Sequence, residues 1–398
     1  MSEAKKRDHR LLTEIRLDNL LSFGPGSPAL PLEALNVLIG PNGSGKSNLI
    51  EAVALMRATH ADLQKVLRQG GGSAEWIWKG ARRDRAAVEF VVKQRDVLKR
   101  PKHNVRHLLE FVANAGARFA LANEQIESIT LDGSQSRIIF GYGQENPVVE
   151  QPQNGRYLEL ETFNFGRSVL AQLRDPQTYP DISFLQDVYE RIRVYRDWTF
   201  GRDSVFRQPQ RADMRNDRLE EDFSNLGLFI NRLRREPQAK AAVLDGLRDL
   251  YNDFTDFDVI VEGGSVQVFF TEGQFTIPAT RLSDGTLRYL CLLAILFDPS
   301  PPPLICIEEP ELGLHPDILP KLADHLAAAS QRTQIIVTTH SDILVDAMTE
   351  RPEAVVICEK HEGRTQMQRL NRDDLAAWLE KYRLGQLWTK GQLGGTRW

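Results

Sequence analysis

Hydrophobic residues mark a strand, a glycine-rich turn and a helix near the start of the chain. Partial alternation of apolar and polar residues begins at Leu12, and an uninterrupted apolar run from Leu35 to Ile39 predicts a buried strand. Beyond the turn, apolar residues recur at helical spacing from Leu49 to Met56. The pattern therefore predicts a strand–turn–helix unit of the kind that builds α/β folds.

The middle of the chain is less regular and changes character once. Residues Ala87–Gln94, Arg106–Val112 and Leu158–Phe165 have strand-like patterns, and together they predict an antiparallel meander. From Ile182 to Leu250 the pattern becomes helical, and Asp222–Arg234 is its clearest amphipathic stretch. We therefore expect a β-rich lobe that is followed by a helical subdomain.

The last third of the chain contains two apolar strands that end in polar residues. An apolar helix, Leu287 to Phe297, precedes the predicted strands 304–307 and 334–337. The first strand runs into Glu308-Glu309-Pro310-Glu311, and the second runs into Thr338-Thr339-His340-Ser341. Because ligands of α/β folds bind at the carboxyl ends of strands, we expect a site at this edge.

The glycine-rich turn carries the residues of a phosphate-binding loop. Gly40-Pro41-Asn42-Gly43-Ser44-Gly45-Lys46-Ser47 fits the pattern GxxxxGK[ST] between a strand and a helix. Its glycines let backbone N–H groups point at one anion, and the helix N-terminus adds partial positive charge. Lys46 would contact the β- and γ-phosphates, and the Ser47 hydroxyl would reach Mg²⁺. A chance glycine turn is the alternative, and the flanking strand and helix argue against it.

The acidic pair supplies the groups that a phosphate loop lacks. Glu308 would hold Mg²⁺ through water, and Glu309 could accept a proton from the water that attacks the γ-phosphate. His340 could donate a hydrogen bond to the γ-phosphate and respond to hydrolysis. Taken alone, the acids fit an exposed strand-end cluster and the histidine fits a structural role. Their occurrence together with the phosphate loop favours a nucleotide site.

Composition restricts the partners without identifying them. The chain has 398 residues, 41% hydrophobic and 26% charged, which is ordinary for a protein that buries a core. A net charge of −4 excludes a general basic coat for nucleic acid. Between Arg191 and Glu236, eleven arginines stand among eight acidic residues, and they predict either a salt-bridged helical surface or a phosphate-contacting patch.

Three features predict a cytoplasmic protein without membrane contact. Cys291, Cys306 and Cys358 lie far apart and fit small core residues of a reducing compartment. The N-terminus is polar, so we expect no signal peptide. No apolar run reaches the ~18–20 residues needed to span a bilayer.

Taken together, these motifs resemble those of ABC-type ATPases. Ser283-Asp284-Gly285 is similar to the ABC signature and lies 25 residues before Glu308, and His340 is similar to the switch histidine. Within that superfamily the chain resembles the RecF/SMC/OLD-like group of AAA-family ATPases, in particular a bacterial subfamily of stand-alone predicted ATPases. The resemblance rests on residues 40–52, 282–288 and 308–316, and on Leu384-Gly385, Leu387-Trp388 and Gly391.

The resemblance implies an α/β fold with the P-loop NTPase head of ABC type. In such a head a mixed sheet is flanked by helices, and here an antiparallel β lobe and an inserted helical subdomain would be added. The expected parts are the N-terminal part of the head with the P-loop at 11–60, the β-rich lobe at 61–180, the arginine-rich helical insertion at 181–255, and the C-terminal part of the head at 256–398.

The resemblance also implies the ligands ATP and Mg²⁺ and a set of site residues. The nucleotide-binding residues would be Asn42, Gly43, Gly45, Lys46, Ser47, Asn48, Ser283 and Gly285; the metal-binding residues would be Ser47 and Glu308; the catalytic residues would be Glu309 and His340. In such heads two chains face each other head to tail, and the signature of one completes the γ-phosphate site of the other. We therefore expect a homodimer or a higher oligomer.

The chain departs from the family pattern at several positions. Glu308 stands where the family usually has an aspartate, so the metal geometry differs by one methylene. The coupling glutamine could be Gln94 or Gln172, and Phe23 could stack on adenine.

The resemblance implies an ATP-gated clamp or sensor in DNA maintenance or anti-phage defence, which would bind DNA or RNA through the arginine-rich insertion. The residues after His340 are too few for a Toprim-type nuclease domain, which needs on the order of 100. We therefore expect a nuclease or a toxin to be a partner chain.

The alternative is a regulatory ATP-dependent scaffold that binds a protein effector without nucleic acid. The form of the signature argues against a transporter subunit, and the absence of long heptads argues against an SMC-type arm.

Overall fold

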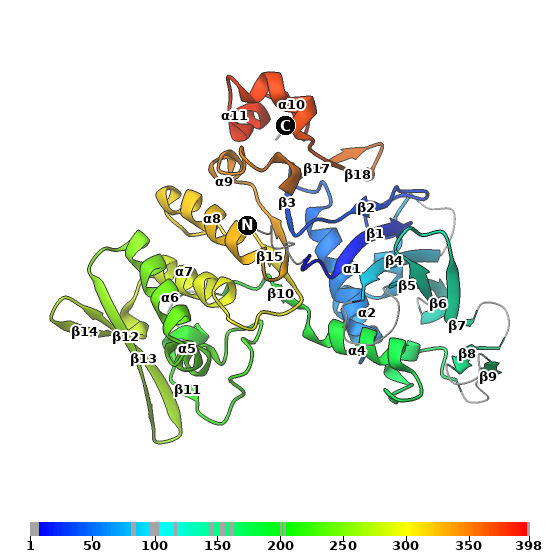
Figure 1. Ribbon diagram of the computed structural model, residues 1–398, viewed down its shortest axis with the longest axis horizontal. Helices are drawn as coiled ribbons and strands as arrows, with labels where there is room; N and C mark the ends of the chain where they lie inside the picture. The colour runs from blue at the N-terminus through cyan, green and yellow to red at the C-terminus, as the bar shows by residue number, and fades with distance from the viewer. Residues whose placement is uncertain are drawn as a thin grey trace, which may run out of the picture. The chain divides into compact units, whose positions relative to one another are not determined.

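The computed structural model describes residues 8–80, 85–94, 103–114, 118–142, 146–151, 156–159, 163–199, 201 and 204–395. The chain divides into two compact units, drawn with the chain coloured from blue to red in Figure 1. The first unit comprises Met1–Ile192, Glu353–Leu370 and Leu393–Trp398, and the second comprises Arg193–Pro352 and Asn371–Gln392. The chain therefore leaves the first unit and returns to it near the C-terminus.

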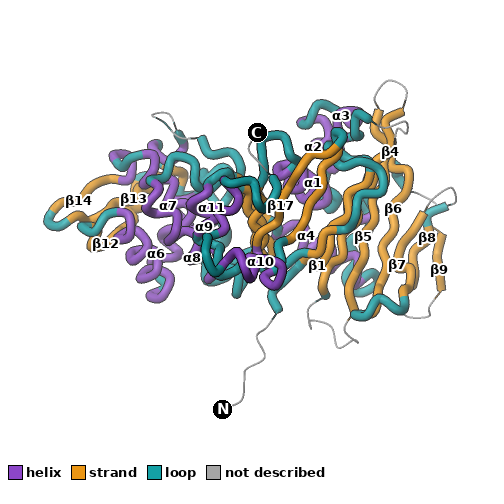
Figure 2. The backbone as a smooth tube through the Cα atoms, turned by 90° about the horizontal axis from the view of Figure 1, so that it is seen from above, coloured by secondary structure: helices purple, strands orange, loops and turns teal. Residues whose placement is uncertain are grey.

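The first unit contains an eight-stranded antiparallel sheet in the order β2-β1-β4-β5-β6-β7-β8-β9. Its strands are β1 (Leu12–Asp18), β2 (Leu30–Pro31), β4 (Arg85–Lys93), β5 (His103–Asn114), β6 (Arg118–Thr130), β7 (Ser136–Tyr142), β8 (Val148–Gln151) and β9 (Arg156–Glu159). Figure 2 shows β5 to β9 following one another across this sheet. Tyr189 stacks on the His107 ring at 5.8 Å between centroids, so the helix that carries Tyr189 covers this sheet.

The first unit also holds the strand that leads into the glycine-rich turn. β3 (Leu35–Ile39) is buried throughout and pairs in parallel with β17 (Val355–His361), which pairs antiparallel with β18 (Arg364–Arg369). The helices of this unit are α1 (Lys46–Ala58), α2 (Leu63–Gln69), α3 (Ser73–Trp76) and α4 (Pro180–Arg191). The uninterrupted apolar run of β3 reflects a strand that is buried on both faces.

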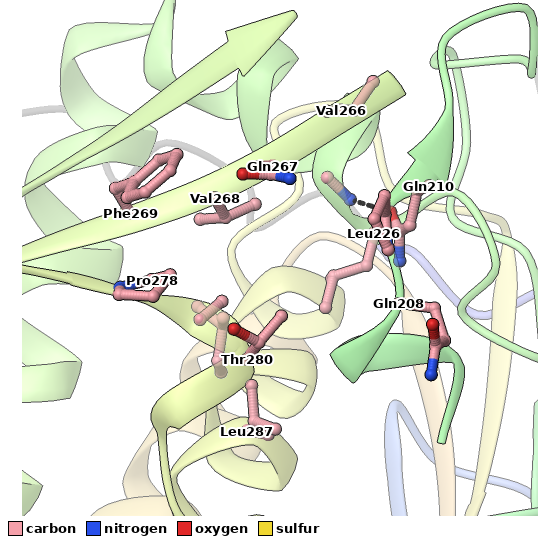
Figure 3. Close-up of a pocket in the computed structure, with 14 residues that line it drawn as sticks. Gln208, Gln210, Leu226, Val266, Gln267, Val268, Phe269, Pro278, Thr280 and Leu287 are labelled. Carbon is pink, nitrogen blue, oxygen red and sulfur yellow. Dashed lines mark hydrogen bonds between the residues drawn. The ribbon is translucent and has the colours of Figure 1, made fainter. Parts of the chain in front are cut away.

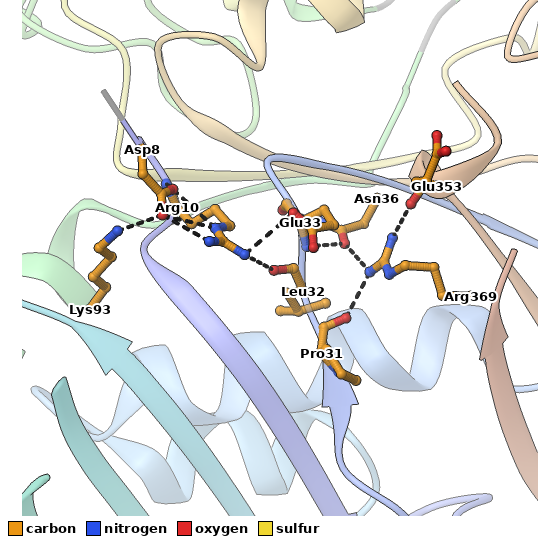
Figure 4. A network of polar contacts seen from close by, with 9 residues as sticks. All are labelled: Asp8, Arg10, Pro31, Leu32, Glu33, Asn36, Lys93, Glu353 and Arg369. Carbon is orange, nitrogen blue, oxygen red and sulfur yellow. Dashed lines mark hydrogen bonds and ion pairs between the residues drawn. The ribbon is translucent and has the colours of Figure 1, made fainter. Parts of the chain in front are cut away.

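A polar network fixes the entry to β3 (Figure 4). Arg369 donates to the Pro31 carbonyl at 2.8 Å and to Asn36 Oδ1 at 2.6 Å. Arg10 lies between Asp8 and Glu33, and its guanidinium holds the pKa of Asp8 well below the usual 3.8. These contacts tie the segment before β3 to the end of β18 and to the start of the chain's first strand.

The second unit contains three parallel strands in the order β10-β15-β16. These strands are β10 (Arg193–Tyr195), β15 (Leu304–Glu308) and β16 (Gln334–Thr338). Helices of this unit are α5 (Leu226–Arg234), α6 (Pro237–Leu250), α7 (Asp284–Leu296), α8 (Leu319–Ala329), α9 (Asp342–Asp346), α10 (Arg372–Leu379) and α11 (Leu384–Thr389). Because α7 is buried along its whole length after its first turn, it forms the centre of this unit.

A small antiparallel sheet adds a second layer to this unit. It consists of β11 (Gln210–Arg211), β12 (Phe254–Glu262), β13 (Ser265–Glu272) and β14 (Phe275–Pro278), and helices α5 and α6 pack on β12. A cavity of about 230 Å³ lies between β13, α5 and the first turns of α7, with Leu226, Val268 and Leu287 among its walls (Figure 3). None of the described residues that line it carries a charge.

Most elements predicted from the apolar pattern are confirmed. β3, α1, β4, β5, α7, β15 and β16 all fall where the sequence predicts them. The helical prediction over 182–250 holds for α4, α5 and α6 but is wrong for 193–195 and 210–211, where β10 and β11 form by pairing with β15 and β13. The predicted helix 222–234 begins only at Leu226, and the predicted strand 158–165 lies partly outside the described residues.

Two further expectations can be compared with the structure. Cys291, Cys306 and Cys358 are all buried free thiols, as expected of core residues. Of the helices that the structure describes, none is long and apolar enough to cross a bilayer.

Candidate functional site

The glycine-rich loop joins the end of β3 to the start of α1 in a shape that only glycine permits. A side chain at Gly40 would place its Cβ 2.1 Å from the Cys358 carbonyl oxygen. A Cβ at Gly45 would lie 2.2 Å from Thr365 Oγ1, and the Gly45 φ of +101° lies where side chains are rarely found. These close approaches hold the loop against β17 and β18.

The loop presents the groups that a phosphate chain requires. Lys46 is 5% exposed, and its ammonium group donates to the Gly40 and Pro41 carbonyls at 2.9 Å each. Ser44 Oγ is buried and has no hydrogen-bond partner among the described residues. Asn42 and Gly43 are exposed beside the N-terminus of the 13-residue helix α1. Backbone donors, one ammonium and an unpartnered hydroxyl suit a polyphosphate anion, so these residues fit ATP.

Two residues outside the loop fix its position. The Thr365 hydroxyl donates to the Ser44 carbonyl at 2.9 Å and lies 2.6 Å from the Ser22 hydroxyl. Asn48 Nδ2 donates to Ser22 Oγ at 2.6 Å, so the first turn of α1 joins the same cluster. Sequence reasoning missed Ser22 and Thr365, because nothing in the local sequence around either residue indicates a contact with the loop.

In the second unit, the acidic pair lies at the end of β15 as predicted. Glu308 is the last residue of the strand, and Glu309 follows in the left-handed region with a φ of 45°. The Glu309 N–H donates to the Thr338 carbonyl at 3.0 Å, which joins the ends of β15 and β16. The structure therefore brings both carboxylates to the strand edge that the sequence predicts.

His340 lies beside this acidic turn. Its Nε2 is 3.5 Å from Glu309 Oε1. The Glu311 carboxylate accepts from the His340 backbone N–H at 2.8 Å and from the Thr339 hydroxyl at 2.7 Å. Burial raises the pKa of Glu311. Glu311 thus fixes the turn that carries His340, a role that the sequence did not indicate.

The predicted signature residues begin α7. Ser283 caps the helix by accepting from the Thr286 N–H at 3.1 Å, and it is exposed. A Cβ on Gly285 would lie 2.8 Å from the Gly313 carbonyl oxygen, in the loop that follows the acidic turn. The signature segment therefore packs against the loop after Glu309.

The remaining candidates take structural positions. Gln94 donates to Asp181 Oδ1 at 3.2 Å at the end of β4, and Gln172 donates to the Arg167 carbonyl at 2.9 Å. The position of a coupling glutamine stays a prediction. The Phe23 ring is 5% exposed and lies in the core, which does not suit stacking on a base in this conformation.

Ser47 and Glu308 are the candidate magnesium ligands. Among the residues that the structure describes, no group of three or more His, Cys, Asp and Glu side chains could hold a metal ion. The magnesium site at Ser47 and Glu308 therefore stays a prediction from the sequence motifs.

Ion pairs occupy much of the arginine-rich stretch. Arg207, Arg211, Arg215 and Arg232 contact Asp284, Asp213, Asp217 and Asp298 respectively, each at 2.6 Å. Arg234 pairs with Asp258. These contacts favour the salt-bridged surface over the phosphate-contacting patch for these five arginines.

Comparison with known proteins identifies a family and a fold. The model of the family described as "AAA domain, putative AbiEii toxin, Type IV TA system" matches residues 35–346. No curated protein sequence gives a significant match.

Among solved structures, the chain is similar to three Smc heads. An Smc head bound to the C-winged helix domain of ScpA is 14% identical with a TM-score of 0.58, over 92% of this chain and 99% of that chain. An Smc head bound to the C-terminal domain of ScpA, from Pyrococcus furiosus, is 14% identical with a TM-score of 0.57, over 93% and 99%. An Smc head with a coiled coil and joint, from Pyrococcus yayanosii, is 11% identical with a TM-score of 0.52, over 93% and 99%. The predicted ABC-type head fold is confirmed.

The contact between Thr365 and the loop generates a prediction. Thr365→Val keeps the side-chain shape but removes the donor to the Ser44 carbonyl, so the affinity for ATP should fall by roughly 3–10-fold, the value of about one hydrogen bond. The measurement is binding of a fluorescent ATP analogue. Thr276→Val in exposed strand β14 is the matched control and should bind normally. Equal affinity of the Thr365 variant and the unaltered chain would contradict the assignment.

Proposed function

The chain belongs to the AAA domain family of putative AbiEii toxins of type IV toxin–antitoxin systems, and from this premise we propose that it binds and hydrolyses ATP as a homodimeric switch. It has the fold of an AAA-type, SMC-head-like ATPase. The hydrolytic reaction, the dimer and the biological role are parts of the proposal.

The P-loop residues would bind the phosphates. The N–H groups of Asn42, Gly43 and Gly45 and the N-terminus of α1 would face the phosphate oxygens, and Lys46 would move from the loop carbonyls to the β- and γ-phosphates. The Ser47 hydroxyl and the Glu308 carboxylate would hold Mg²⁺, which neutralises the charge that develops on the phosphates. Asn48 would keep the first turn of α1 in place through Ser22.

One observation supports hydrolysis more than any other: Glu309 and His340 lie 3.5 Å apart at neighbouring strand ends. A carboxylate at this position can accept a proton from water, and an imidazole beside it can donate a hydrogen bond to a phosphate oxygen. Glu309 would therefore act as the general base and His340 as the γ-phosphate sensor. Their side chains are 35% and 32% exposed, so both can reach a substrate.

The signature supports a dimer. Ser283 is exposed at the N-terminus of α7 and is available to another chain. We propose that Ser283 and Gly285 of one chain complete the γ-phosphate site of the second, as in other heads of ABC type. ATP would then stabilise the dimer, and hydrolysis would release it.

A substitution at Glu309 tests this proposal. Glu309→Gln removes the base but keeps the size of the side chain, so hydrolysis should fall by about 10²–10⁴-fold while an ATP-bound dimer accumulates. Phosphate release and light scattering after gel filtration measure the two effects. Glu362→Gln, at an exposed glutamate that also has a positive φ, should change neither. Hydrolysis by the Glu309 variant at the parental rate would refute the assignment of Glu309 as the base.

Lys46→Ala should abolish both ATP binding and the ATP-dependent dimer.

The biological role that we propose is defence, in a toxin–antitoxin setting with a partner protein. The family description supports this role, and two of the similar Smc heads are bound to domains of ScpA. DNA maintenance, with contact to nucleic acid through the arginine-rich stretch, is the second candidate. The ion pairs in that stretch argue against contact with nucleic acid. They therefore support the alternative of a scaffold that binds a protein effector.

DNA binding discriminates between these roles. Because at least five arginines of the stretch already pair with carboxylates, we expect no measurable binding to a 30-base-pair duplex at physiological salt, with or without ATP. Arg235 is exposed and is the suitable probe, since Arg232 and Arg234 hold Asp298 and Asp258. Salt-dependent binding that is weakened by Arg235→Glu would favour DNA maintenance instead.

A further inference from the structure

Arg288 lies in the core of the second unit, against the acidic turn. It belongs to the second turn of α7 and is 6% exposed. Its guanidinium carbon lies 4.4 Å above the Trp198 ring centroid, and Nη2 donates to the Glu309 carbonyl at 2.9 Å. Burial lowers the pKa of Arg288 to about 10, so the side chain is charged at neutral pH.

Trp198 completes a pair of contacts with the acidic turn. Its indole Nε1 donates to the Glu308 carbonyl at 2.8 Å. The stacked side chains of Arg288 and Trp198 therefore hold the main-chain carbonyls of both acidic residues. Neither contact uses a carboxylate oxygen of Glu308 or Glu309.

The turn needs such support because Glu309 has an unusual backbone conformation. A φ of 45° is unfavourable for a residue with a side chain and persists only where surrounding contacts impose it. The Glu309 N–H is held by the Thr338 carbonyl, and the Leu312 N–H donates to the Glu309 carbonyl at 3.2 Å. Arg288 supplies the charged donor to that same carbonyl.

We propose that Arg288, supported by Trp198, is a positioning residue that keeps the Glu309 carboxylate beside His340. This inference rests on the proposed function, in which Glu309 is the general base. Because Arg288 stands five positions after Ser283 on the same buried helix, it also connects the signature segment to the base. Engagement of Ser283 by a second chain would therefore act on the alignment of Glu309 through α7.

The experiment compares Arg288→Met with Arg288→Lys. Loss of the donor lets the turn relax and displaces the Glu309 carboxylate, so kcat should fall by about 10–100-fold in Arg288→Met. KM and the affinity for a fluorescent ATP analogue should stay within about threefold, since Arg288 belongs to the second unit and the P-loop to the first. Arg288→Lys should recover much of kcat, because an ammonium group can reach the same carbonyl.

Matched variants separate positioning from general stability. Arg332→Met removes another arginine that donates to main-chain carbonyls, those of Leu296 and Asp298, and it should leave kcat within about twofold. Trp198→Phe keeps an aromatic ring but removes the donor to the Glu308 carbonyl, so kcat should fall several-fold without loss of folding. This variant carries the test if Arg288→Met does not fold.

Repeating Arg288→Met in a chain that also carries Glu309→Gln tests whether Arg288 acts through Glu309. If Arg288 acts through Glu309, Arg288→Met should cause no further loss of rate in a Glu309→Gln chain. Two results would overturn this inference alone, provided that the unaltered chain turns over normally. One is an equal loss of rate in both backgrounds, and the other is an unchanged kcat in both Arg288→Met and Trp198→Phe. Absence of turnover by the unaltered chain would overturn the proposed function together with it.

Discussion

The candidate phosphate loop depends on backbone contacts that are too close for any side chain. Gly40 and Gly45 lie against the Cys358 carbonyl and the Thr365 hydroxyl, which belong to β17 and β18 at the far end of the chain. The loop can therefore adopt its shape only when both ends of the chain have come together in the first unit. The network around Arg369 and Asn36 reinforces the same association at the other end of β3. This constraint explains why the first unit is discontinuous in sequence.

In the second unit, backbone contacts likewise fix the residues at the ends of β15 and β16. Glu309 is held in a strained conformation through its backbone, and His340 is held through its backbone by Glu311. Both of these contacts are made by main-chain atoms of the two candidate residues. Arg288 and Trp198 extend this arrangement to the helix that begins at the signature. In both units, positioning is accomplished mainly by contacts to main-chain atoms.

Local patterns predicted the elements that are defined by burial or by a short motif. β3, β15 and β16 are continuous apolar runs because each strand is buried, and the P-loop is a contiguous set of residue types. The helical prediction is wrong at 193–195 and 210–211 because β10 and β11 form only by pairing with strands far along the chain. The small sheet at 254–278 was missed, although alternation on both sides of Gly263-Gly264 could have indicated a hairpin. Thr365, Trp198 and the role of Arg288 depend on tertiary contacts that no local pattern contains.

The central claim is that the chain hydrolyses ATP at sites that two copies complete together. The most direct measurement is phosphate release by the unaltered chain with Mg²⁺ and saturating ATP, across a wide range of chain concentrations. Turnover per chain should rise with concentration and then level off as the dimer becomes populated. Turnover that is independent of concentration would contradict the shared site, and no phosphate release at any concentration would contradict the ATPase itself.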